Sequence, residues 1–169
     1  MAGKYVELEL GGLDKFLDKV DDAGNGEFKK AVLEFLEGLG VEFLRVVEDE
    51  IIRLQVVDTR LLLHSFHKGS DQNLWELDEG DLTLEVGTNV QYAWYVEDGH
   101  HQTPGRFIPG VWQGDHFRYQ PGADTGMVLK ASWVDGKHYF RHAIRIMEHM
   151  LPSLVERKLI EWIEQYFTV

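Results

Sequence analysis

The sequence predicts an α+β domain, and three observations lead to that class. Two long segments, 27–55 and 138–167, repeat apolar residues at three- and four-residue steps, which is the period of an amphipathic helix. Between them lie short segments rich in Leu, Val and aromatic residues, separated by turn residues, as is typical of strands. The chain has 169 residues, 44% of them hydrophobic, and no linker divides it, so we expect one packed domain over 1–169.

Composition excludes several function classes. With 17 basic and 29 acidic side chains the formal charge is −12, and no basic patch is visible, so we expect DNA to pass this surface without being bound specifically. The absence of Cys removes disulfides, thiolate zinc sites and thiol nucleophiles. We find neither a signal peptide nor a run of about 18 apolar residues, and therefore expect neither secretion nor membrane insertion.

The amino-terminal segment predicts a strand, a helical turn and a loop. Residues 5–10 alternate between polar and apolar side chains, which favours a short edge strand, and residues 13–20 have helical spacing. The acidic segment 21–26 resembles a calcium loop, but Ala23 and Val32 stand where carboxylate ligands are needed. We interpret 21–26 as a solvated turn.

Both long helices contain residues that disfavour helix. Gly38 and Gly40 mark either a bend or a close approach to another backbone, and we favour a tolerated kink. Pro152 removes a backbone donor, so we expect a kink there or two helices, 139–150 and 153–166.

The middle of the chain predicts strands. The segments 60–66, 73–77 and 81–86 are short, apolar and separated by turns, which favours an antiparallel meander. In the third segment, apolar and polar side chains alternate, so one face should be buried and the other wet.

The segment 98–137 is rich in Gly and Pro and predicts a projecting hairpin at about 100–134. We expect 106–113 to pair with 116–120 or with 127–134. Its aromatic residues either fold back on the core or face a partner.

Motifs for catalysis are scarce. The chain has no phosphate-binding loop, dinucleotide fingerprint or nucleophile elbow. His138 and His142 are four residues apart on the predicted helix, with His149 near the same face, which suits zinc, but Tyr139 stands where a zinc protease has its Glu. We interpret the three as residues at a helix boundary and keep a metal-dependent hydrolase as the alternative.

The most distinctive segment of the chain spans residues 82–99 and has the sequence LTLEVGTNVQYAWYVEDG. We call it the central motif. Thr88 or Asn89 can cap a helical turn after the strand, and Gly99 can end it. The turn presents Tyr92, Tyr95 and Val96 on one face. We interpret Tyr92 and Val96 as core residues, because aromatic and apolar side chains dominate cores.

The central motif resembles the minor head-tail joining proteins, the neck or tail-completion family, of long-tailed phages and PBSX-like prophages. Two flanking segments agree, 57–66 and 136–143; Arg60 and Leu63 stand where the family has Gly and Arg, and His142 where it has Pro. The matching positions are Asp58, Thr59, Ser65, Gly87, Thr88, Asn89, Tyr92, Ala93, Tyr95, Val96, Glu97 and Gly99.

The resemblance implies a structural virion protein and no enzyme. It implies a small twisted antiparallel sheet packed by the long amino- and carboxy-terminal helices. The subunits would form a ring, a hexamer, that joins the tail tube protein to the head connector in the virion, after assembly in the host cytoplasm, with no cofactor or metal. Because the chain is acidic, we expect an acidic channel that discourages DNA from sticking.

The projecting hairpin is the expected contact with a neighbour or the connector. Trp, Tyr, Phe and Arg dominate interface hot spots, and the candidates are Trp112, His116, Phe117, Arg118 and Tyr119. We expect deletion of 110–126 to leave a folded chain that no longer joins heads to tails. Two alternatives stay open, namely a phage-encoded metal-dependent hydrolase using His138, His142 and His149, and a scaffolding factor absent from finished particles.

Overall fold

The computed structural model describes residues 4–9, 26–56 and 60–166. In chain order its elements are β1 (Lys4–Glu9), α2 (Glu27–Arg53), α3 (Leu61–His64), β2 (Asn73–Asp78), β3 (Thr83–Thr88), α4 (Ala93–Asp98), β4 (Gly99–His101), β5 (Phe107–Gln113), β6 (His116–Tyr119), β7 (Gly126–Val128), β8 (Trp133–Asp135) and α5 (Tyr139–Tyr166). The predicted helical turn at 13–20 and all of the predicted turn at 21–26 except Gly26 lie outside the described residues.

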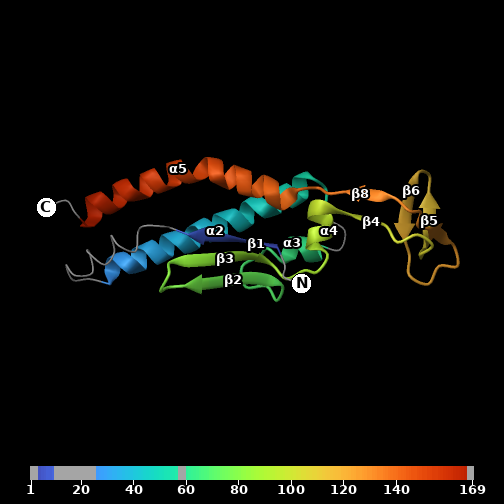
Figure 1. Ribbon diagram of the computed structural model, residues 1–169, viewed down its shortest axis with the longest axis horizontal. Coiled ribbons are helices and arrows are strands. Elements are labelled where there is room, and N and C mark those ends of the chain that lie inside the picture. The colour runs from blue at the N-terminus through green and yellow to red at the C-terminus, as the bar shows by residue number, and fades with distance from the viewer. Residues whose placement is uncertain (1–3, 10–25, 57–59, 167–169) are drawn as a thin grey trace.

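The elements form a body with an arm at one end (Figure 1). In the body, α5 runs along α2, and α2 packs on a sheet with strand order β1-β3-β2. The arm, residues 99–135, contains β4 to β8 and leaves the body beyond α3 and α4. The predicted α+β class, a small antiparallel sheet packed by long helices, is therefore confirmed.

The central strand β3 pairs antiparallel with β1 on one side and β2 on the other. Leu84 and Val86 are fully buried, whereas Thr83 and Glu85 on the other face are partly exposed, as the alternation predicted. The prediction of a strand over 60–66 was wrong, because that segment forms α3. Leu62 and Phe66, four residues apart, are both buried, which is helical spacing, and β1 supplies the third strand instead.

The core lies between the two long helices and the inner face of the sheet. Phe43 of α2 meets Phe140 of α5 edge to face, with ring centroids 5.4 Å apart. Farther along, the indole of Trp162 packs edge to face on the rings of Phe28 and Phe35. These contacts hold α5 against α2 near both of its ends.

Gly38, Gly40 and Pro152, which were expected to bend or interrupt the long helices, have different surroundings in the structure. A Cβ on Gly38 would meet nothing within 4 Å, but one on Gly40 would lie 2.5 Å from Leu84 Cδ2 and 2.8 Å from the Trp75 ring. Gly40 therefore marks a close approach of α2 to the sheet, and our preference for a kink was wrong there. The helix α5 continues through Pro152, which is exposed, so a division into two helices was also wrong.

The arm contains a two-stranded ribbon, β4-β8, and a sheet of order β6-β5-β7. The predicted pairing of 106–113 with 116–120 is confirmed, since Val111 lies opposite Arg118 and Trp112 opposite Phe117. β5 also pairs with β7, so most of the segment predicted as a projecting hairpin is ordered strand.

Candidate functional site

Two glycines join the arm to the body. Gly99 ends α4 with φ +83°, a conformation that favours glycine, as the sequence predicted for a helix stop. A Cβ there would lie 2.5 Å from the Val134 carbonyl oxygen. A Cβ on Gly136, between β8 and α5, would overlap the Glu97 carbonyl oxygen. The two strands of the arm therefore leave the body in direct backbone contact.

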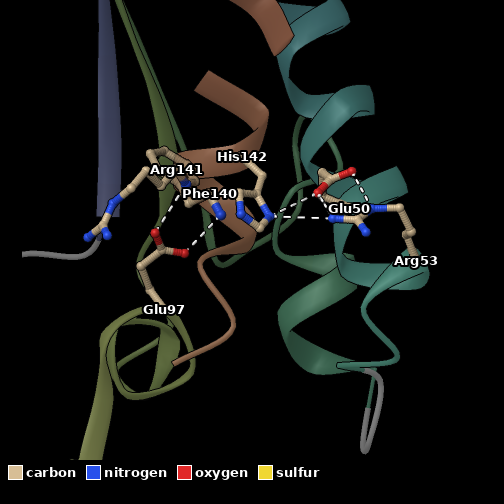
Figure 2. A network of polar contacts seen from close by, with 6 residues as sticks. All are labelled: Glu50, Arg53, Glu97, Phe140, Arg141 and His142. Carbon is tan, nitrogen blue, oxygen red and sulfur yellow. Dashed lines mark hydrogen bonds and ion pairs between the residues drawn. The ribbon is translucent and has the colours of Figure 1, made fainter. Parts of the chain in front are cut away.

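Glu97 ties the same junction to α5. Its side chain is only 2% exposed, and its carboxylate accepts hydrogen bonds from the backbone amides of Phe140, at 2.8 Å, and Arg141, at 3.1 Å (Figure 2). A carboxylate at this position satisfies two of the unpaired amides of the first helical turn and faces the positive end of the helix dipole. The Glu97 carbonyl oxygen also accepts from the amide of His138, at 3.1 Å.

Other positions of the resemblance hold α3 against the sheet. The Thr88 hydroxyl donates to Ser65 Oγ at 2.7 Å, and the Ser65 hydroxyl donates to the Leu62 carbonyl oxygen at 2.7 Å, all of them buried. The amide of Val90 donates to Thr88 Oγ1 at 3.1 Å and closes a turn after β3. The N-cap position of α4 is Tyr92, with no side-chain cap hydrogen bond, so the prediction that Thr88 or Asn89 caps this helix was wrong. Asn73, which sequence reasoning missed, donates from Nδ2 to the carbonyl oxygens of Ser65 and Gly87.

The start of the 57–66 segment lies partly outside the described residues. Asp58 and Thr59 fall there, so no position is assigned to them. Arg60 has φ +62°, in the left-handed region. The family's Gly at this position would adopt that conformation without strain, whereas an Arg does so at a cost of about 1 kcal/mol.

The aromatic face of α4 is turned outward. Tyr92 is 37% exposed and Tyr95 40%, so the interpretation of Tyr92 as a core residue was wrong, whereas Val96 packs against the core and Ala93 is buried. Asn89 is exposed. Tyr92 and Tyr95 line a groove of about 430 Å³ where the arm begins, and the groove also includes side chains of His100, His101, Gln102, Thr103, Arg106 and Leu129.

The residues predicted for an interface lie in the arm but on both of its faces. Because residues opposite each other on paired strands share a face, Trp112, Phe117 and Tyr119 lie on one face of the β6-β5-β7 sheet. His116 and Arg118 lie on the other. Trp112 is 58% exposed and Tyr119 62%, so these two side chains do not fold back on the core.

The three histidines are not brought together as one group of possible metal ligands among the described residues. His138 precedes α5 with φ +55°, so the prediction that it shares a helix face with His142 was wrong. His149 is exposed on α5. Within the described part of the chain, one group of three metal-type ligands comes together, formed by Glu97, Asp98 and His138. Both carboxylate oxygens of Glu97 already accept backbone amides, which assigns that side chain to the α5 cap.

A second buried carboxylate lies at the opposite side of α5. Glu50 of α2 accepts hydrogen bonds from Arg53 Nε at 2.8 Å and Nη2 at 2.6 Å, and His142 Nδ1 lies 3.4 Å from Glu50 Oε2 (Figure 2). The hydrogen bonds from Arg53 lower the pKa of Glu50 despite its burial. Next to the junction, burial raises the pKa of the Tyr139 hydroxyl, and the nearby charge of Glu97 raises it further.

Sequence reasoning missed the group formed by Glu50, Arg53 and His142. A Glu and an Arg three residues apart on a helix usually form a solvated pair, and no local pattern shows that α5 covers one of them. The burial of Glu50 could be recognised only in the folded structure, where His142 of α5 lies beside it.

Comparison with known proteins adds the family. Residues 13–99 match the family described as "Bacteriophage HK97-gp10, putative tail-component", and this match ends at Gly99, where the arm begins. Over almost their whole lengths, two proteins of Bacillus subtilis strain 168 are also similar. "Uncharacterized protein YqbI" is 43% identical over 95% of this chain and 100% of its own, and "Phage-like element PBSX protein XkdI" is 38% identical over 94% and 99%.

No solved structure matches this chain. Among the described residues, no helix is long and apolar enough to cross a membrane. The family match covers half of the chain, and both relatives align along nearly all of it. The chain therefore belongs to the HK97-gp10-like family of phage tail components.

Proposed function

We propose that this chain is the tail-completion, or neck, subunit of its phage or prophage. Copies form a hexameric ring that joins the tail tube to the head connector and leaves a channel for DNA. One observation carries the proposal beyond a tail component, namely the arm. It extends from the end of the body and exposes Trp112 and Tyr119, which are side-chain types enriched at interface hot spots.

The junction supports this use of the arm. Gly99 and Gly136 place the two strands of the arm in backbone contact, and the Glu97 cap connects them to α5. An arm with a fixed direction loses less conformational freedom on binding than a mobile loop. This arrangement suits a subunit that must present one surface to a neighbour at a defined angle.

The first test removes the reading frame from the phage or prophage and images the induced lysate by negative-stain electron microscopy. The proposed role predicts separate filled heads and free tails. Joined, intact particles would contradict it.

The second test removes only the outer part of the arm, residues 104–130. Replacing residues 104–130 by a Gly-Ser-Gly turn keeps the β4-β8 ribbon, in which the Gln102 amide donates to the Ser132 carbonyl oxygen, and leaves α2 and α5 intact. This variant should retain the helical circular dichroism of the wild type and fail to complement the deletion. A matched control with the exposed Gln120→Ala change in the arm should complement.

Particle composition separates this role from that of a scaffolding factor. Mass spectrometry of purified particles should find this chain in joined particles at a fixed ratio to the tail tube protein. A chain needed for joining but absent from particles would be a scaffold. Zinc analysis of the tag-free protein, with no bound zinc expected, separates it from the metal-dependent hydrolase.

A further inference from the structure

The outer face of the body's sheet carries three carboxylates in a row. Glu7 of β1 lies opposite Glu85 of β3, and Glu85 lies opposite Glu76 of β2. Neighbouring strands are about 4.8 Å apart, so the row places three negative charges side by side. We call it the glutamate row.

The glutamate row is unfavourable in the isolated subunit. Like charges directly opposite each other on paired strands destabilise a sheet. Within the described part of the chain, none of the three forms an ion pair, and the outward positions of β2 and β3 hold no Lys or Arg. A cationic partner surface would relieve this repulsion.

The outer part of the arm carries a net positive charge, opposite in sign to the glutamate row. This part, residues 106–130, which we call the arm head, holds three basic and two acidic side chains, a formal charge of +1. The rest of the chain then holds 14 basic and 27 acidic side chains, a charge of −13. The cations are Arg106, Arg118 and Lys130; all are exposed, and none forms an ion pair among the described residues.

One face of the arm head combines charge with apolar surface. Arg118 lies opposite Val111, and by strand alternation this face also presents Phe107 and Val128, which are both at least half exposed. The arm head extends from the end of the body, away from the sheet of its own subunit (Figure 1). A partner for this face must therefore come from another molecule.

We propose that the arm head of one copy docks on the outer face of the body's sheet in the next copy, with Arg118 against the glutamate row. This contact rests on the proposed ring. It joins two different surfaces and is therefore heterologous, so repetition of the same contact closes a ring if the rotation permits. Charge complementarity sets the orientation, and the aromatic face with Trp112 and Tyr119 stays available for the connector or the tail tube.

The chain lacks Cys, which makes crosslinking a clean test. An epitope-tagged chain carrying both Arg118→Cys and Glu76→Cys is assembled into particles and treated with a short bis-maleimide, which links two thiols without an oxidant. We expect a ladder of covalent multimers that ends at the number of subunits in the ring. The single variants should give no multimers, and a mixture of the two single variants should stop at dimers.

A control pair uses another exposed carboxylate. Arg118→Cys combined with Glu148→Cys, on α5, should give no ladder. Dimers from Arg118→Cys alone would mean that arms pair with arms, and crosslinks to a different virion protein would mean that the arm docks there. Either result, or an absence of crosslinks in joined particles, overturns the inference.

A charge exchange gives a second readout. Glu76→Lys with Glu85→Lys should abolish joining, and adding Arg118→Glu to the same chain should restore it at least tenfold in plaque or particle yield. Failure of the exchange to restore joining counts against the inference. The proposed function fails separately, if deletion of the whole reading frame leaves heads and tails joined.

Discussion

The carboxylate of Glu97 caps α5 through the amide of Phe140, although the two lie 43 positions apart in sequence with the whole arm between them. The amide of Arg141 donates to the other carboxylate oxygen. The last residues of the body before the arm and the first helical residues after it are thus held together by one buried side chain. The stability of the body and the direction of the arm should both depend on Glu97.

Replacing Glu97 by Ala should lower the free energy of unfolding by about 2–3 kcal/mol, because two buried amides lose a charged acceptor. Glu97→Gln should cost less, since its amide oxygen can still accept one hydrogen bond. Urea denaturation followed by circular dichroism measures both. Glu148→Ala, on the exposed face of α5, is the control and should change stability by less than about 0.5 kcal/mol.

The two glycines of α2 should respond in opposite directions. Gly38→Ala should raise the free energy of unfolding by about 0.5–1 kcal/mol, because Ala is the better helix former and the site is open. Gly40→Ala should lower it by about 1–3 kcal/mol, because its methyl group would collide with Leu84 and Trp75. Thermal or urea unfolding of the Gly38→Ala and Gly40→Ala variants measures both changes in the free energy of unfolding. A stabilising Gly40→Ala would contradict the close approach of α2 to the sheet.

Glu50 predicts an acid-dependent loss of stability. Its hydrogen bonds to Arg53 hold its pKa below the ordinary value, so the folded state binds fewer protons there than the unfolded state. This contribution is fully present at neutral pH. It falls as the pH drops below the pKa of a free glutamate, about 4.3, and is lost below the folded pKa.

Unfolding measured from pH 7 to pH 3 should therefore show a shallower decline for Glu50→Gln than for the wild type. The variant lacks the titrating group and starts from a lower stability at pH 7. Glu156→Gln, an exposed α5 substitution, should follow the wild-type curve. Parallel curves for Glu50→Gln and the wild type would contradict the assignment.

Glu85 is the middle member of the glutamate row. Neutralising it with Glu85→Gln should stabilise the isolated subunit by about 0.2–1 kcal/mol, because two like-charge neighbours lose their repulsion. The gain should shrink at 1 M salt, where the screening length falls to about 3 Å. Glu148→Gln is the matched control, and a destabilising Glu85→Gln would mean that the row has a favourable partner within the subunit.

Several parts of this structure could be predicted from local patterns. The spacing of apolar residues located α2 and α5, the alternation in 82–86 located β3, and Gly and Pro marked the arm. Gly99 was recognisable as a helix stop because that position has a strong preference for glycine.

The errors have a common cause. The segment 60–66 has the composition of a strand, but burial of Leu62 and Phe66 against the core made it helical. Tyr92 resembled a core residue, yet it lines the groove at the base of the arm. In each case tertiary packing overrode a local preference that is weak by itself.

The α+β class, both long helices, the central strand and the resemblance to phage joining proteins were predictable from the amino-acid sequence, because these depend on periodicity and on a contiguous motif. Three other features required the folded chain: Glu97 caps α5, Glu50 lies beside His142, and Glu7, Glu85 and Glu76 form a row. Each of these joins residues far apart in the chain. Such pairings follow from the register of the strands and the packing of the helices, which no local pattern encodes.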